Sequence, residues 1–267
     1  MKIVKITKTG LYYKVKFDND EVYKFHESII IKYLFLKKGT VVSVEALNQA
    51  TLDNLYYLAL DKGVNYLSTY HSRKEVVMYL RKHYEPDIVD RVLLKLEELK
   101  LINDLEYAKY FVHMMKKRAY GVNKIINELK ENNISSEFIL EAISAYSDEE
   151  QMENCNKCFL KYLPQLKKES KLGAKKKATN YLISHGFSND IITIVLEKNV
   201  ELLDNITDED EILKKMYLKL LKSKNAKIDE KKFRNKVIRN LSSKGFPLYK
   251  ILKIMEDGFD DDQRQNR

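Results

Sequence analysis

Residues that form tight turns are scarce in this chain of 267 residues, which has 8 glycines and 3 prolines. These counts are about 3% and 1% of the chain, against average usage of roughly 7% and 5%. Large β-sandwiches, barrels and propellers need many turns with special backbone angles, so the scarcity argues against those folds. Long helices joined by polar connections are the favoured alternative, and 44% hydrophobic residues suffice for a core.

Long apolar runs and a cysteine framework are also missing. No segment approaches the roughly 18 apolar residues of a membrane span, and lysines interrupt residues 1–5 before a signal-peptide core could form. The two cysteines cannot make a disulfide framework, which fits a reducing compartment. We therefore expect a cytoplasmic protein with no membrane partner.

The first 50 residues differ from the rest of the chain. Apolar residues alternate with lysines over 13–17, an Asp-Asn-Asp turn follows, and residues 22–25 resume extended character, which predicts a β-hairpin. Residues 3–6 supply a third strand. Because so small a sheet is marginal alone, we expect it to pack on the amphipathic segments that follow, up to residue 47. Residues 1–50 are predicted to form a small α+β head.

From Leu52 onward the apolar pattern is helical and occurs four times. Each copy has a leucine, a large apolar residue four or five positions later, another five positions after that, and an apolar pair three positions further on. The leading residues, which are 49, 53 and 59 positions apart, are Leu80, Leu129, Leu182 and Leu241. A period near 50 is typical of α-helical repeats whose units bury their apolar faces against one another.

The predicted fold is mainly α, with tandem three-helix repeats in a curved elongated array behind the head. The head, repeats 1 to 4 and a polar tail are assigned to residues 1–50, 52–102, 104–147, 148–200, 207–257 and 258–267. Helix-start signals with N-cap spacing are Ser72 with Glu75, Asn103 with Glu106, and Ser147 with Glu150. Pro86 suits a first helical turn, while Gly186 and Gly245 suit links where a helix ends in a left-handed residue.

Motifs that carry catalysis or bind metals are weak here. Cys155 and Cys158 have C-x-x-C spacing, but no histidine lies nearby and no other cysteine exists, so we interpret them as ordinary helix residues. The five histidines lack metal-ligand spacing. The segment 173–177 lacks the second glycine and the preceding strand of a phosphate-binding loop. We predict no catalytic residue, no metal and no cofactor.

Cationic clusters on predicted helices remain. Residues 116–118 end the first helix of repeat 2, residues 175–177 lie in repeat 3, and eleven cations fall between Lys214 and Arg239. Each cluster alone is compatible with a solvated helix face, but together they favour an acidic partner. The tyrosines with apolar-face spacing, which we expect in or near the core rather than on a base-stacking surface, are Tyr56, Tyr66, Tyr79 and Tyr107.

A run of short motifs occupies the centre of the chain. Residues 101–108 read LINDLEYA, residues 117–121 read KRAYG, residues 126–130 read INELK, and Ile134 closes the run. This run resembles the central signature of the RecX family of regulatory proteins.

Segments outside this run share the likeness. Residues 66–68 and 72–80 are similar to the RecX family's opening motif, and the N-terminal strands resemble the extra head of its longer members. Asn132 and Asn133 stand where a glycine is frequent in the family. The likeness thus covers almost the whole chain.

The resemblance implies a modulator of the RecA recombinase. Such a protein lies in the groove of the RecA filament on single-stranded DNA and restrains strand exchange and ATP hydrolysis, within homologous recombination, DNA repair and the SOS response. It would act by binding, without chemistry, and we expect a monomer. Motif position assigns partner contacts to Arg81, Lys82, Arg91, Lys116, Lys117, Arg118 and Lys124. Charge alone adds Lys175, Lys176 and Lys177.

Two other functions are compatible with the residues alone. A protein that binds single- or double-stranded DNA directly, without RecA, would also use scattered cations, and its affinity would fall steeply with salt. A scaffold for some other protein would need neither DNA nor RecA.

Overall fold

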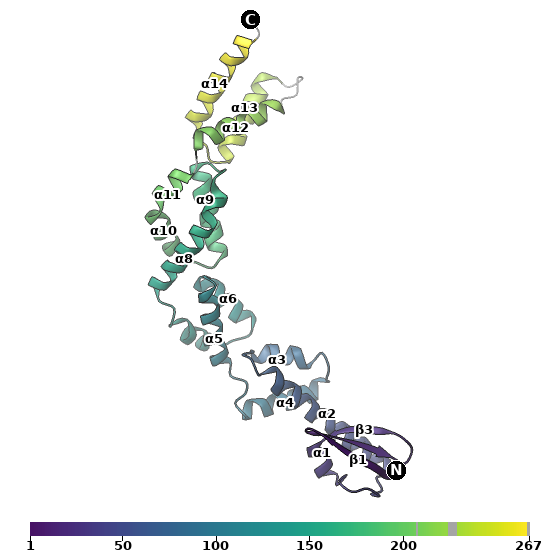
Figure 1. Ribbon diagram of the computed structural model, residues 1–267. Helices are drawn as coiled ribbons and strands as arrows, with labels where there is room; N and C mark the ends of the chain where they lie inside the picture. The colour runs from purple at the N-terminus through teal and green to yellow at the C-terminus, as the bar shows by residue number, and fades with distance from the viewer. Residues whose placement is uncertain (207, 224–228, 266–267) are drawn as a thin grey trace. The chain divides into compact units, whose positions relative to one another are not determined.

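The structure of the protein is a computed structural model in which a small antiparallel sheet precedes a series of helices (Figure 1). It describes residues 1–206, 208–223 and 229–265, except for the side chains of residues 206 and 257–265. Across this part of the chain, no helix is long and apolar enough to cross a membrane.

The backbone divides into two compact units. The first comprises Met1–Tyr110 and Leu129–Ala142, and the second Phe111–Glu128 and Ile143–Arg267. Elements that begin in the first stretch are β1 (Ile3–Thr9), β2 (Tyr12–Phe17), β3 (Val22–His26), α1 (Glu27–Lys32), α2 (Val44–Tyr66), α3 (Arg73–Leu80), α4 (Pro86–Glu98) and α5 (Asp104–Lys117).

The later elements continue the helical series. They are α6 (Val122–Glu131), α7 (Ser136–Ile143), α8 (Asp148–Tyr162), the 3-10 helix η1 (Leu163–Leu166), α9 (Lys171–Ser184), α10 (Asn189–Lys198), α11 (Val200–Ile206), α12 (Glu209–Lys222), α13 (Glu230–Ser243) and α14 (Leu248–Gln265). The boundaries between predicted repeats stay predictions. Residues 207 and 224–228 of repeat 4, with the predicted cations Lys224 and Lys227, and residues 266 and 267 of the predicted tail lie outside the described residues, as do the side chains of 257–265.

The head confirms the predicted hairpin and its third strand. The sheet has the order β1-β2-β3 and is antiparallel throughout. Val15 and Phe17 are fully buried and Lys14 is exposed, as the alternation predicts. The buried face packs on Ile29 and Ile30 of α1 and on Leu47 of α2, so the following amphipathic segments do complete its core.

Helix α2 also closes one edge of the sheet through Asn54. The backbone N–H of His26 donates to Asn54 Oδ1 at 2.8 Å, and Asn54 Nδ2 donates to the carbonyl of Lys24 at 3.0 Å. The amide thus occupies the donor and acceptor positions that a fourth strand would fill. Because an open strand edge invites pairing with other chains, this buried side chain protects the edge of β3.

The repeat leucines lie in the core, as the period predicts. Leu80, Leu129, Leu182 and Leu241 are all fully buried. Leu80 belongs to one apolar cluster, Leu182 to a second and Leu241 to a third. The helical-repeat fold class is therefore confirmed.

The predicted helix starts are confirmed at atomic level. The Ser72 hydroxyl accepts the N–H of Glu75, and the Glu75 carboxylate accepts the N–H of Ser72. Ser147 and Glu150 form the same reciprocal capping box. Pro86 begins α4, where its missing N–H costs no helical bond.

The links between consecutive helices dock on the N-termini of earlier helices. Gly186 and Gly245 both have φ +90, and Asn133 reaches the left-handed region at φ 61 without being glycine. The N–H of Gly121 donates to the carbonyl of His185 at 2.8 Å, and the N–H of Asn123 to that of Gly186 at 3.0 Å. Amides at the start of α6 are therefore satisfied by carbonyls at the end of α9.

The same docking recurs at other links. Ser170, which caps α9, donates its hydroxyl to the carbonyl of Lys244 at 2.6 Å. The Lys74 ammonium in the first turn of α3 donates to the carbonyl of Glu131. Only glycine fits at the tightest of these contacts, since a Cβ on Gly121 would lie 2.3 Å from the carbonyl oxygen of Gly186.

Replacing Gly186 with alanine is expected to destabilise the second unit. A Cβ there would lie 2.4 Å from the backbone nitrogen of Lys124, in addition to the strain of a left-handed residue. Together these effects should cost roughly 2–4 kcal/mol of unfolding free energy. Gly10→Ala is the matched control, because Gly10 has φ +63 and open space around it. Equal losses for both variants in urea denaturation would contradict the docking contact.

Candidate partner-binding surfaces

Of the predicted cations of repeat 1, two directly follow the end of α3 and the third lies on α4. Arg81 follows α3, and its guanidinium is 3.8 Å from Asp90 Oδ1 in an exposed ion pair. Arg91 lies on α4 with its guanidinium 5.0 Å from the centre of the Tyr56 ring. Lys82 is exposed and forms no ion pair with another described residue. Arg81 is thus brought beside α4, and Lys82 projects into solvent.

Lys116 connects the end of repeat 2 to the start of repeat 3. Its ammonium pairs with the Glu150 carboxylate, lies 3.4 Å from the carbonyl oxygen of Ala145 and sits 5.3 Å from the centre of the Tyr146 ring. The hydrogen bond from Lys116 is the main cause that lowers the pKa of Glu150 below its ordinary 4.5. The stabilisation from this pair is therefore complete above pH 4.5 and lost as the pH falls through the lowered pKa.

The neighbouring cations are more available. Lys117 and Arg118, at the end of α5, are exposed and pair with no acidic side chain among the described residues. Lys124 lies in the first turn of α6, where its ammonium is 4.5 Å from the centre of the Tyr120 ring and 4.0 Å from Glu128 Oε1. Of the four predicted contacts in repeat 2, two are open to a partner and two are engaged within the unit.

The lysines of repeat 3 lie together on the exposed side of α9. Lys177 pairs with Glu169 at 2.6 Å. Lys175 lines a small hollow of about 180 Å³, and Lys176 has no ion-pair partner in the described residues. The triplet therefore offers two free ammonium groups.

A cationic face on α13 was not among the predicted contacts. We call it the α13 cationic face, and its residues line an open hollow of about 610 Å³: Lys232, Asn235, Lys236, Arg239, Asn240 and Ser243. The signal in the sequence is the excess of eleven cations over two acids, Asp229 and Glu230, between Lys214 and Arg239. Charge counting alone could not show which of these cations share one side of a helix.

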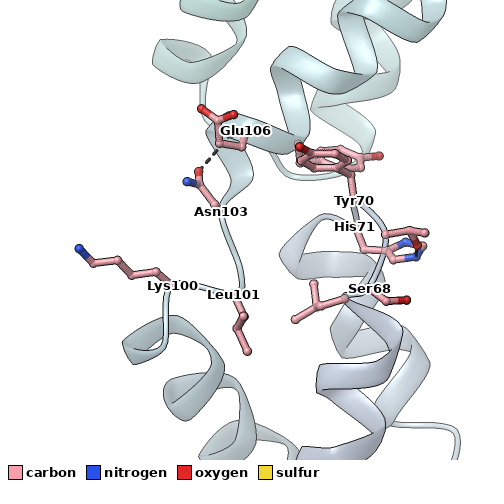
Figure 2. Close-up of a pocket in the computed structure, with 10 residues that line it drawn as sticks. Ser68, Tyr70, His71, Lys100, Leu101, Asn103 and Glu106 are labelled. Carbon is pink, nitrogen blue, oxygen red and sulfur yellow. Dashed lines mark hydrogen bonds between the residues drawn. The ribbon is translucent and has the colours of Figure 1, made fainter.

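A second unpredicted hollow, of about 370 Å³, lies between repeat 1 and the start of repeat 2 (Figure 2). Figure 2 shows Leu101 and Asn103 on one wall and Ser68 and His71 on the other. The His71 ring is held by Thr69, 2.9 Å from its Nε2, and by Glu75, 3.3 Å from its Nδ1. Lys100 is the one lysine or arginine among the residues lining this hollow. The hollow would therefore bind an anion only weakly.

The two cysteines and the four tyrosines with apolar-face spacing are buried or pack against buried apolar residues. Cys155 and Cys158 are buried in the core of repeat 3, and burial raises the pKa of the Cys155 thiol to about 12. Tyr107 is 5% exposed. The rings packed against the repeat 1 core are Tyr56, Tyr66 and Tyr79. Across the described residues, no group of three or more His, Cys, Asp or Glu side chains could hold a metal ion.

Comparison with known proteins assigns the family. No model of a known protein family matches the chain. The regulatory protein RecX of Listeria monocytogenes is 32% identical over 232 residues, which cover 85% of this chain and 85% of the relative. The chain belongs to the RecX family. The RecX protein of Leuconostoc mesenteroides is 33% identical over 202 residues, which cover 74% of this chain and 75% of the relative.

A solved RecX structure supports the fold. A crystal structure of regulatory protein RecX has a TM-score of 0.61 and 24% sequence identity, and the match covers 73% of this chain and 98% of that one. The resemblance of the central motifs to the RecX signature is therefore confirmed at the level of family and fold.

Lys116→Gln is expected to destabilise the protein, and Lys117→Gln is not. Lys116 loses the ion pair with Glu150 and the contacts with Ala145 and Tyr146, so the melting temperature should fall by about 1–3 °C. Lys117 is exposed and should give no measurable change. Thermal melting followed by circular dichroism compares the two. A fall in melting temperature for Lys117→Gln alone would contradict the structural role of Lys116 and the solvent exposure of Lys117.

Both thiols are expected to resist alkylation in the native protein. With a pKa of about 12, only about one Cys155 in ten thousand is ionised at pH 8. Intact-mass measurement should show no label on the folded chain and two labels after denaturation. Lys157→Cys is the control, since this exposed position lies on the same helix and should take a label at once. Rapid native labelling of the unmodified chain would contradict the burial.

Proposed function

We propose that this protein binds the RecA filament on single-stranded DNA and restrains strand exchange and ATP hydrolysis, as a non-enzymatic regulator in the cytoplasm. The observation that carries the proposal is the similarity to regulatory proteins RecX over 85% of both chains. RecA as the partner is what membership of the family implies. The repeats support it, because stacked three-helix units offer a long series of separate contacts.

The contact surface that we favour in repeat 2 is the pair Lys117 and Arg118. Both lie at the end of α5 within the RecX-like run of motifs, and both are exposed without an acidic partner among the described residues. Lys116 and Lys124 support them indirectly, because their ammonium groups are engaged by Glu150 and Tyr120. Lys82 and Lys176 offer comparable free ammonium groups in repeats 1 and 3.

The mechanism follows from multivalent binding. Repeats that contact successive filament subunits would hinder the subunits' motion and exchange, and individually weak patches would sum to a firm attachment. Substoichiometric amounts could then affect many RecA subunits.

ATP hydrolysis by RecA on single-stranded DNA provides the first test. Wild-type protein in substoichiometric amounts should lower the rate, and the double variant Lys117→Gln, Arg118→Gln should need roughly five to ten times more protein for the same effect. The matched control is Lys167→Gln, Lys168→Gln, which removes two exposed charges from another segment. No change in hydrolysis rate or filament persistence with wild-type protein would contradict the proposal.

The two alternatives predict different responses. A protein that acts on DNA without RecA would bind bare DNA tightly and gain nothing when RecA coats the strand. A scaffold for another protein would respond to neither. Affinity capture from lysate with and without nuclease, followed by identification of the bound chains, separates these outcomes.

A further inference from the structure

Helix α13 is strongly two-sided. Phe233, Val237 and Leu241 are buried in the core of repeat 4. The opposite side carries the α13 cationic face, on which every side chain is exposed except the partly buried Asn240. Because one side is buried, the rotation of α13 about its axis is fixed. The cations on the other side therefore point toward solvent in a defined arrangement.

The cations of this face are not neutralised. Lys232, Lys236 and Arg239 form no ion pair with any acidic group in the described part of the chain. Three acids of repeat 4 have other partners, since Glu209 and Asp210 hold Lys250 and Glu211 holds Lys215. Lysines of other repeats do find acids, as in the pairs Lys95 with Glu98, Lys109 with Glu141, Lys116 with Glu150, and Lys177 with Glu169.

The spacing brings like charges together. Lys232 and Lys236 are four positions apart, and Arg239 follows after three, so all three lie along one side of the helix where like charges repel. The row from Lys232 to Ser243 is about 16 Å long at 1.5 Å per residue. An anion bound along this row would reduce the repulsion between the cations. To reach all three cations, the anion must itself be an extended molecule.

The residues between the cations indicate the chemistry of that anion. Asn235 and Asn240 supply amide donors beside the charged groups, while the Ser243 hydroxyl already donates to the backbone carbonyl of Asn240 at 2.8 Å. Such donors suit a partner that carries acceptor oxygens all along its length, as the sugar-phosphate backbone of a nucleic acid does. The hollow is open along one helix instead of enclosed, which suits a polymer better than a small molecule.

We propose that the α13 cationic face binds the backbone of single-stranded DNA directly, without RecA. A duplex binder normally places one element in a groove and others on the phosphates that flank it, whereas this face is a single row on a single helix. The face has no aromatic side chain on which a base could stack, so we assign its contacts to the phosphates and sugars. This activity goes beyond the proposed action on RecA filaments, because it needs no RecA.

Fluorescence anisotropy of a labelled single-stranded oligonucleotide with the full-length protein tests the inference. The variant Lys232→Gln, Lys236→Gln, Arg239→Gln should bind at least about tenfold more weakly at low salt. The plot of log affinity against log salt should become shallower by about 2, because each neutralised phosphate contributes roughly 0.7 on single strands. The matched control is Lys167→Gln, Lys168→Gln, Lys198→Gln, which removes the same charge from exposed positions and should change both quantities little.

Three results would overturn the inference. Equal losses in the two triple variants would show a general charge effect. Tighter binding of a duplex of the same sequence would assign the face to double-stranded DNA, and equal competition by a polyglutamate peptide of the same charge would assign it to an acidic protein. Unchanged melting by circular dichroism confirms that each variant is folded.

The RecA assay keeps this inference separate from the proposed function. If wild-type protein leaves RecA hydrolysis unchanged but the α13 variant loses bare-strand binding, the inference stands and the proposed function fails. If hydrolysis is restrained while the α13 variant binds bare strands normally, the inference fails and the proposed function stands.

Discussion

The repeat units depend on one kind of contact, in which carbonyls at the end of a helix accept hydrogen bonds from the start of an earlier one. At the junction of α6 and α9 this contact is made by backbone alone, and Gly121 and Gly186 approach so closely that no side chain fits between them. Unsatisfied groups at both helix ends are thereby paired with each other. Because backbone atoms are less adaptable than side chains, the contact fixes the register between neighbouring helices, and the apolar clusters form around it.

Much of this architecture could be predicted because it depends on local patterns. The leucine period, the Ser72 and Ser147 capping boxes and the left-handed Gly186 and Gly245 each follow from residues close together in sequence. The partner of Gly121 lies 65 residues away, so no spacing rule indicates why glycine is needed there. Asn133 shows the converse, since a left-handed link forms at φ 61 without the glycine that the family pattern favours.

The candidate contacts were harder to predict than the fold. Charge identifies cations but not their neighbours, and Lys116 and Lys117 differ in role although they are adjacent. Lys116 turns toward Glu150, which is 34 positions away, while Lys117 stays in solvent. The net charge of +9 is spread along the sequence, so it likewise does not show where free cations gather in space. Ion pairs leave this net charge unchanged but decide where it lies, and the unpaired Lys232, Lys236 and Arg239 concentrate it on the α13 cationic face.

Helix α2 belongs to two cores at once. Its first turns carry Leu47 and Ala50 into the head, Asn54 completes the edge of β3, and Ala59 enters the core of repeat 1. One uninterrupted helix of 23 residues therefore replaces a linker between the sheet and the first repeat. The head and repeat 1 therefore move as one rigid body. A partner bound by the head would keep a fixed orientation relative to repeat 1.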